Sequence, residues 1–376
     1  MWAGIQRELK YLIRHKWDFC LTVLAPLLVI VLFSAMFMHG KPEHVPIGLI
    51  DQDQGELSHQ IDKYLSLNHS LAVVLRTSSQ QEAEQQLNQN KIWGYVQIPA
   101  GAEQRLVQGK DAEIAIVYNQ SYFSLGNTIS SAMLVSSLKA IGDFAGNHYL
   151  LNLLPDLDLP SPHVKISPLF NPSLNYEFYL GPFIIPAVLH LLLCCCVAFA
   201  VGQEFKYATT ATWLNTPHVM RALFAKILVY VIIFCLWTWL WLFWLVEIRG
   251  WFIAGSLSLL MLAQFLFYLS YALLSATVVI ASKNLAKTFG ILAVYGGSSL
   301  SFAGVTLPLN NAPLFTQTWA LLIPYTPYAR LQTEQWVVGS PISTSLPALW
   351  VLIFFCVFFS LCCAILLKKY KKGMSL

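Results

Sequence analysis

Apolar residues occur along this chain in one long run near the N-terminus and in a close series of runs in the C-terminal half, with a polar stretch between them. A helix needs about 20 apolar residues to cross the hydrocarbon core of a bilayer. The runs that meet or approach this length are 19–38, 180–201, 223–246, 257–281, 289–305 and 346–367. This pattern predicts an α-helical integral membrane protein with six transmembrane helices and one large domain inserted between helices 1 and 2.

The predicted organisation has four parts. Residues 1–16 form an amphipathic interfacial helix, 17–38 the first transmembrane helix, 39–178 the inserted domain, and 179–376 helices 2–6. Composition supports a membrane protein, because 11% of the 376 residues are charged, against about 25% in soluble domains. Each of the eight cysteines lies in or beside an apolar run. We therefore expect no disulfide framework in the polar domain and no metal site, and we expect no nucleic-acid partner because basic and aromatic residues are not interleaved.

Lysine and arginine residues determine the expected orientation. They are concentrated before the first run, between the second and third runs, in 282–287 and in the C-terminal tail. The short loops on the opposite side offer only Arg249 and Arg330. Both termini are therefore predicted to be cytoplasmic and the inserted domain to be outside. The first run could instead be a signal peptide, but it is long for one and lacks an A-x-A-like cleavage site.

In the first sixteen residues, apolar and basic residues recur at helical spacing. One face carries basic residues, and the opposite face carries Trp2, Ile5, Leu9, Leu12 and Ile13. Such a helix lies at the membrane surface. We expect it on the cytoplasmic side, where it either anchors the chain or binds a partner.

The inserted domain has the pattern of an α/β fold. Short β-type runs alternate with helical runs, which favours a layered sheet with crossover connections. The expected strands are 45–51, 71–76, 92–98 and 113–118, and the expected helices are 56–67, 79–88, 100–107 and 121–152. A proline-rich stretch, 155–172, then returns the chain to the membrane. The inserted domain contains neither the nucleophile motif G-x-S-x-G nor the metalloprotease motif H-E-x-x-H. We therefore predict a protein without catalytic residues.

Ionisable residues deep in the apolar runs are scarce. His190 is the titratable group well inside the second run, and Gln264 is a polar residue inside the fourth. Proton- or sodium-coupled transporters usually carry buried carboxylates at mid-membrane depth, and none is visible here. The phosphate-binding pattern G-x-x-x-x-G-K-[ST] is also missing. If this chain moves a substrate uphill, the energy has to come from another polypeptide.

Two connecting segments have more order than simple loops. Segment 203–217 ends with Thr216 as a helix cap and Pro217 at the first helical position, a favoured arrangement. Segment 302–328 is apolar and aromatic but repeatedly interrupted by proline. Irregular backbone at membrane depth is tolerated where protein buries it or where it lines a cavity. We therefore predict a coupling loop at 203–217 and a re-entrant segment at 302–328.

Small residues recur at spacing four in the fifth run, at Ala293, Gly297 and Ser301. Such a stripe lets helices approach closely. The neighbour could be another helix of the same chain, a second copy of the chain, or the transport pathway.

Together these features resemble the ABC-2 type permease family, in the bacterial multidrug branch with a large extracytoplasmic domain. One matching pattern is Glu204-Phe-Lys, Thr209, Thr216-Pro217 and Lys226. A second runs from Phe302-x-Gly304 to Pro324-x-Thr326, and a third is the strand 92–99. The resemblance covers essentially the whole chain. Ala208 and Ala312 stand where Gly and Met are common in the family, which leaves the subgroup open.

The resemblance implies a set of partners and roles. The partners are a cytoplasmic ATPase that carries ATP and Mg²⁺, a second permease, the lipid membrane and, as a further possibility, a periplasmic adaptor; the chain itself binds no cofactor. Residues implied in coupling to the ATPase are Arg7, Arg14, Glu204, Phe205, Lys206, Thr209, Thr216 and Pro217. Residues implied in the substrate pathway or its gate are Phe183, Phe302, Gly304, Pro308, Pro313, Gln317, Pro324 and Thr326.

The leading hypothesis is the permease of an exporter of amphipathic or lipid-like, drug-type molecules in a bacterial inner membrane. A glycolipid or polysaccharide exporter is the nearest alternative, although such permeases usually lack a large external domain. A membrane receptor or scaffold that acts through its external domain is the alternative from another class. An ordered coupling loop favours the exporter, because a scaffold has no need of one.

Overall fold

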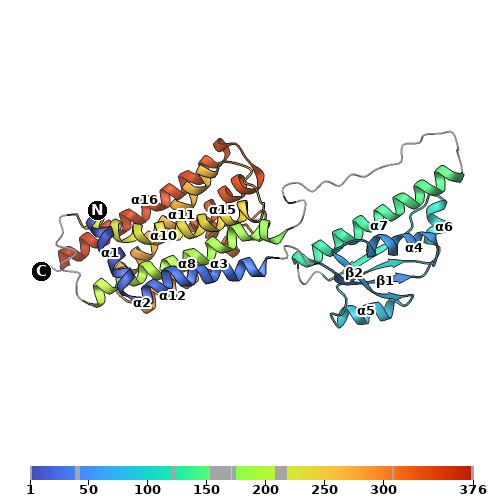
Figure 1. The fold of residues 1–376 in the computed structure, drawn as a ribbon, viewed down its shortest axis with the longest axis horizontal. Coiled ribbons are helices and arrows are strands. Elements are labelled where there is room, and N and C mark those ends of the chain that lie inside the picture. The colour runs from blue at the N-terminus through green and yellow to red at the C-terminus, as the bar shows by residue number, and fades with distance from the viewer. Residues whose placement is uncertain are drawn as a thin grey trace. The chain divides into compact units, whose positions relative to one another are not determined.

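The computed structural model describes residues 2–38, 43–119, 123–152, 171, 175–207, 218–306 and 309–373. The chain divides into two compact units, one comprising Met1–Met38 and Asn175–Leu376 and the other His39–Leu174. Figure 1 shows that the first unit is helical and that the second combines helices with a small sheet.

The helical unit begins with the short helix α1, Trp2–Arg14, and the first apolar run follows as three joined pieces, α2, η1 and α3. Their bounds are Lys16–Phe19, Cys20–Leu24 and Ala25–Met36. The other long helices are α8 (Tyr176–Lys206), α10 (Val219–Glu247), α11 (Leu257–Ser282) and α16 (Ile342–Gly373). Shorter pieces are α12 (Leu285–Gly297), α13 (Ser299–Phe302), α14 (Leu314–Leu322), α15 (Tyr325–Gln332) and η2 (Thr333–Val338).

Five of the predicted spans correspond to helices long and apolar enough to cross a membrane. Among the described residues these are Lys16–Met36, Tyr176–Lys206, Val219–Glu247, Leu257–Ser282 and Ile342–Lys371. The run 289–305 is not among these five helices, so the predicted count of six is not confirmed. The run is divided at Ser298 into α12 and α13, where two adjacent glycines, Gly296 and Gly297, weaken the helix.

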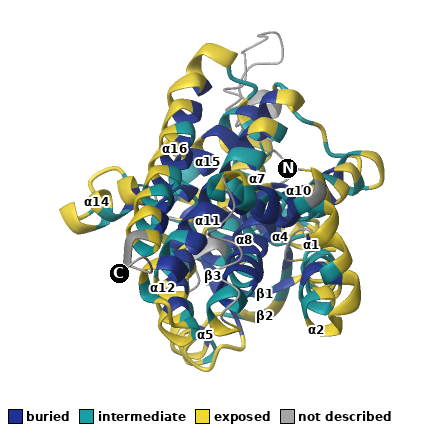
Figure 2. Cartoon of the chain, turned by 90° about the vertical axis from the view of Figure 1, so that its left-hand side faces the viewer, coloured by how far each residue is buried: buried dark blue, intermediate teal, exposed yellow. Residues whose placement is uncertain are grey.

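The interior of the helical unit is formed mainly by α8 and α11, whose buried residues appear dark blue in Figure 2. Aromatic rings of α11 and α15 fill its centre. Phe267 stacks on Tyr328 with ring centroids 4.3 Å apart, and Tyr325 meets Phe267 edge-on at 5.5 Å. In contrast, most of α14 is exposed.

Two prolines shape the helices of this unit. A proline has no N–H, so it leaves the carbonyl four residues earlier without its helical donor. Pro26 does this to Thr22, and the Trp237 indole on α10 donates to that carbonyl at 3.2 Å. Pro182 does the same to Phe178, and the Trp336 indole on η2 donates at 3.3 Å. Each proline therefore creates an acceptor that fixes a distant segment.

The second unit contains four strands, β1 (Val45–Asp51), β2 (Leu71–Thr77), β3 (Gly94–Ile98) and β4 (Ala115–Tyr118). Their order is β2-β1-β3-β4; β1 pairs in parallel with both neighbours, whereas β3 and β4 are antiparallel. Helices α4 (Glu56–Ser66) and α7 (Phe123–Asn152) cover one face, α5 (Gln80–Asn88) covers the other, and α6 (Ala102–Val107) joins β3 to β4.

The α/β region predicted for 45–118 is therefore present, with the crossover connections expected for parallel strands. Strands β3 and β4 begin two residues later than the predicted 92–98 and 113–118. Ser79 caps α5, and its side chain accepts a hydrogen bond from the backbone N–H of Glu82.

Candidate functional site

Helix α1 meets α8 and α10, which are distant from it in the sequence, at the last turn of α8. The Lys226 ammonium on α10 lies 2.7 Å from a Glu204 carboxylate oxygen on α8 and 3.7 Å from a Glu8 carboxylate oxygen on α1. These side chains are 11%, 16% and 5% exposed, respectively. A single buried cation is thus shared by two carboxylates from different helices.

Helix α1 is docked against α10 by close packing as well as by charge. The Tyr230 hydroxyl donates to Glu8 at 2.9 Å, and Leu12 is buried beside the core. A Cβ placed on Gly4 would lie 3.0 Å from the Ala225 Cβ, so the two backbones approach closely. Burial raises the pKa of Glu8 above its ordinary value, while the nearby Lys226 charge acts to lower it.

A second set of polar contacts joins α1 to α8. The Tyr11 hydroxyl donates to the Gln203 amide oxygen, and the Gln203 amide nitrogen donates to Asp18 at 3.5 Å. Burial, reinforced by the Asp18 charge, raises the pKa of Tyr11 to about 12, so this phenol remains a donor at neutral pH. We use the name α1 cluster for Glu8, Tyr11, Gln203, Glu204, Lys226 and Tyr230.

The α1 cluster includes only one of the residues predicted for coupling, Glu204. Phe205 packs edge-on against Tyr370 on α16, with centroids 5.5 Å apart. Lys206, Arg7 and Arg14 are exposed. Thr209, Thr216 and Pro217 lie outside the described residues.

Sequence reasoning missed Glu8 and Tyr230 and did not pair Lys226 with any acid. A signal for Glu8 was present, because it lies four residues before Leu12 and three after Ile5, on the same helix face. The apolar face expected for α1 is in fact divided between two sides. Leu12 is buried against the protein, whereas Trp2, Leu9 and Ile13 are exposed. Those three side chains are free to enter a lipid surface.

The first turn of α8 carries a second buried acid. Glu177 is 1% exposed and accepts from the Arg249 Nε at 2.8 Å and from the Trp251 indole at 2.9 Å. The same guanidinium donates through Nη2 to the Met38 carbonyl at 2.9 Å. We call Glu177, Arg249, Trp251 and Met38 the Arg249 clamp. It joins the beginning of α8 to the segment that follows α10 and to the end of the first apolar run.

The residues predicted for a pathway or gate occupy different environments in the single chain. Phe183 and Pro324 are buried, and the Phe183 carbonyl accepts from the Tyr325 hydroxyl at 2.7 Å. The Thr326 hydroxyl is buried and makes no hydrogen bond to any described residue. Segment 302–328 is thereby tied to α8 from its C-terminal side.

The N-terminal part of that segment is more open. Phe302 is half-buried and meets Phe315 edge-on at 6.2 Å. Gly304 has a φ of +80°, a left-handed conformation that favours glycine. Pro313 precedes α14, and Gln317 is exposed, donating to the Ala312 carbonyl at 2.8 Å. Pro308 lies outside the described residues.

The small-residue stripe faces away from its own chain. Ala293, Gly297 and Ser301 are exposed, whereas Gly296 and Ser299 on the other side are buried. A Cβ added to Gly297 would meet no atom of the described residues within 4 Å, whereas a Cβ added to Gly296 would lie 2.6 Å from Leu191. The stripe therefore remains available to a neighbour outside this protomer.

A bundle of apolar helices with a separate α/β unit defines a membrane-spanning protein of several passes. Residues 16–365 match the family described as ABC-2 family transporter protein, and the chain belongs to this family. Over 364 residues it is 20% identical to the probable multidrug ABC transporter permease YbhR of Escherichia coli K12, with 94% of each protein covered. No solved structure matches the chain.

A second relative is similar over a shorter stretch. The linearmycin resistance permease protein LnrN of Bacillus subtilis 168 is 28% identical over 107 residues, which is 28% of this chain and 27% of that protein. Permeases of the ABC-2 family are the membrane subunits of transporters; ATP hydrolysis lies in a partner, and the permeases typically form dimers.

Proposed function

We propose that this chain is the permease of an ATP-driven exporter that moves amphipathic or lipid-like, drug-type molecules outward across a bacterial inner membrane. ATP and Mg²⁺ are bound by a separate ATPase subunit. The observation that carries the proposal is the α1 cluster, in which Lys226 connects an interfacial helix to two long apolar helices. The multidrug and resistance permeases among the relatives support the drug-type substrate.

In this proposal α1 and segment 203–217 contact the ATPase on the cytoplasmic side. Arg7 and Arg14 are exposed on α1 and provide positive charge for an acidic ATPase surface. A displacement of α1 changes the distance between Glu8 and Lys226, and Lys226 also holds Glu204 on α8. The motion therefore passes into α8 and α10 through a shared charge in a poorly solvated site, where such interactions are strong.

The pathway lies between two permeases, along α8, α12 and segment 302–328. The exposed stripe of Ala293, Gly297 and Ser301 supports a contact with a second permease, because small residues let helix backbones approach. The matched pair Gly297→Leu and Gly296→Leu tests this. Gly297→Leu should lower the dimer fraction in gentle detergent and leave the unfolding midpoint of the protomer unchanged, whereas Gly296→Leu should lower that midpoint.

Both termini are cytoplasmic in the proposal, and the α/β unit is periplasmic, where it can dock an adaptor. Cysteine-labelling from the two sides of the membrane tests the orientation. A surface crosslinking screen that recovers no envelope protein would contradict the proposal that the α/β unit docks an adaptor.

The decisive experiment is a pull-down of the tagged chain from native membranes in gentle detergent, followed by mass spectrometry. A stoichiometric protein with a phosphate-binding loop is the expected result. Recovery of envelope proteins alone, in several detergents, would favour a receptor or scaffold.

Charge reversal at Glu204 then tests the coupling site. Glu204→Lys places a second cation beside Lys226 and should reduce export and substrate-stimulated ATP hydrolysis at least tenfold, a cost of about 1.4 kcal/mol or more. Glu247→Lys is the matched control, because Glu247 is an exposed acid at the far end of α10. Equal transport by both variants would contradict the role of the α1 cluster.

A further inference from the structure

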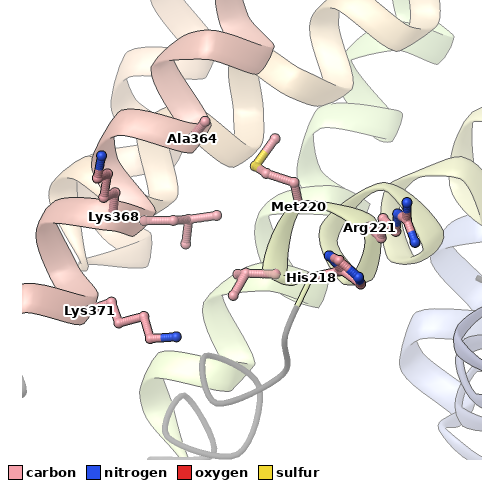
Figure 3. A pocket seen from close by; sticks show the side chains of 8 residues that line it. His218, Met220, Arg221, Ala364, Lys368 and Lys371 are labelled. Atoms are coloured by element: carbon pink, nitrogen blue, oxygen red, sulfur yellow. The ribbon is translucent and has the colours of Figure 1, made fainter.

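An open pocket of about 440 Å³ lies between the start of α10 and the end of α16. Figure 3 shows α16 on one side, with Lys371 extending toward α10, and His218, Met220 and Arg221 on the other side. This pocket is separate from the α1 cluster and from the residues predicted for the pathway. Its eight lining residues are His218, Val219, Met220, Arg221, Ala364, Leu367, Lys368 and Lys371.

The lining combines positive charge with an apolar wall. Arg221, Lys368 and Lys371 are cationic, and none of them forms an ion pair with a residue in the described part of the chain. No acidic side chain is among the eight lining residues, all of which are described. The apolar half consists of Val219, Met220, Ala364 and Leu367.

The backbone adds a second attraction for an anion. Helix α10 has 29 residues, and its N-cap, His218, makes no side-chain capping hydrogen bond. The first N–H groups of a helix have no partner within the helix, and the helix dipole places partial positive charge there. The N-terminus of a long helix therefore favours a negative group, and here it borders a pocket lined by three cationic residues, of which Lys371 extends toward α10.

We infer that this pocket binds the phosphate headgroup of an anionic phospholipid, with the acyl chains against its apolar wall. The inference rests on the proposed orientation, which puts the ends of these two membrane-spanning helices at the cytoplasmic leaflet. Basic pockets between transmembrane helices on that side are suited to anionic headgroups. Free phosphate would use the cations but gain nothing from the apolar wall, so a lipid fits the whole pocket.

The test is native mass spectrometry of the purified full-length chain, titrated with phosphatidylglycerol or phosphatidylethanolamine. The pocket variant is Lys368→Gln/Lys371→Gln. The control is Lys287→Gln/Lys369→Gln, which removes the same charge from exposed positions that do not line the pocket. Phosphatidylglycerol should bind the pocket variant about thirtyfold more weakly, from about 1 kcal/mol per cation near the surface, and bind the control as it binds the wild type.

A third variant tests the apolar half without changing charge. Ala364→Trp fills the wall of the pocket and should also weaken phosphatidylglycerol binding, even though all the cations remain. Millimolar inorganic phosphate should not displace the lipid from the wild type.

Three results would overturn the inference: equal lipid binding by the pocket and control variants, displacement by inorganic phosphate, or lost ATPase binding in the pocket variant with unchanged lipid preference. The last result would make the pocket a docking surface for the ATPase. Lipid binding is measured on the permease alone. A failure of the lipid-binding inference is therefore distinguishable from a failure of the proposed function. The latter would appear as the absence of any ATPase partner.

Discussion

The two ends of α8 each carry a carboxylate paired with a cation from the α10 region, Glu177 buried and Glu204 partly buried, but the pairs are built differently. At one end, Glu177 holds the Arg249 guanidinium, whose fork also reaches the Met38 carbonyl. At the other end, Lys226 lies between Glu204 and Glu8. A guanidinium presents donors in a rigid plane, whereas an ammonium is a point charge on a flexible stem.

This difference separates a fixed junction from one that can be adjusted. The Arg249 clamp has one carboxylate with one cation. The cation and the Trp251 indole both donate to Oε2 of Glu177, and its Oε1 makes no hydrogen bond to any described residue. In the α1 cluster the cation is shared, so a movement of α1 changes the charge balance at α8. We therefore expect the Arg249 clamp to contribute mainly to stability and the α1 cluster mainly to communication.

The largest expected effect on stability belongs to Arg249→Met. It leaves the Glu177 carboxylate buried without its cation, and removing one partner of a buried pair costs about 3–5 kcal/mol. Because the Arg249 side chain is partly exposed, we expect the lower end, a loss of about 3 kcal/mol in the free energy of unfolding by denaturing detergent. Arg330→Met is the control, since the Arg330 side chain is 60% exposed, and it should cost under about 1 kcal/mol. Similar losses in the two variants would contradict the clamp.

Lys226→Met should have the next largest effect and a different signature. It leaves Glu8 and Glu204 close together without a cation, and we expect a loss of about 2–3 kcal/mol. Hydrogen exchange of residues 2–14 should increase severalfold in this variant and remain unchanged in Arg249→Met. If Arg249→Met loosened α1 equally, the two ends of α8 would not have separate roles.

Glu8→Gln should have the smallest effect, and its effect should depend on pH. Burial raises the pKa of Glu8 above its ordinary value of 4.5, so the folded chain holds this proton more tightly than the unfolded chain does. The stability contributed by Glu8 is therefore complete below pH 4.5 and is lost as the pH rises through the raised pKa. Charged or titratable groups around Glu8 are Lys226, Tyr230, Arg7 and Glu204.

Glutamine mimics the protonated carboxyl and keeps an acceptor for Tyr230. The difference in thermal unfolding midpoint, variant minus wild type, should be near zero at pH 4.5 and become positive by pH 8. A difference that is negative at pH 8 would mean that the attraction of Lys226 outweighs burial, and that the ionised carboxylate stabilises α1.

Much of the fold was predictable because its signals are local. Strand β1 at Val45–Asp51 and helix α11 at Leu257–Ser282 lie within a residue or two of their predicted bounds. A short β-type run defines the strand, and a long apolar run defines the helix. The helix break within the run 289–305 was harder to predict. The composition of this run is that of a span, but the glycines at 296 and 297 divide the helix.

The candidate site was only partly predictable. Glu204 was expected from a family pattern, but it pairs with Lys226, which also pairs with Glu8, and this brings together residues from three helices. The sequence likewise did not predict whether the stripe of Ala293, Gly297 and Ser301 is exposed, because spacing alone does not tell which neighbour a small-residue face meets.

By itself, the sequence determined the membrane class, the α/β character of the inserted region and the family, since each depends on composition or on order along the chain. The tertiary structure alone decided which charges are buried and which carbonyls find donors. Lys226 reaches Glu8, and the Trp237 indole reaches Thr22, across more than 200 positions of sequence. Burial makes such contacts strong, and burial depends on how the helices pack, which no local pattern of residues specifies.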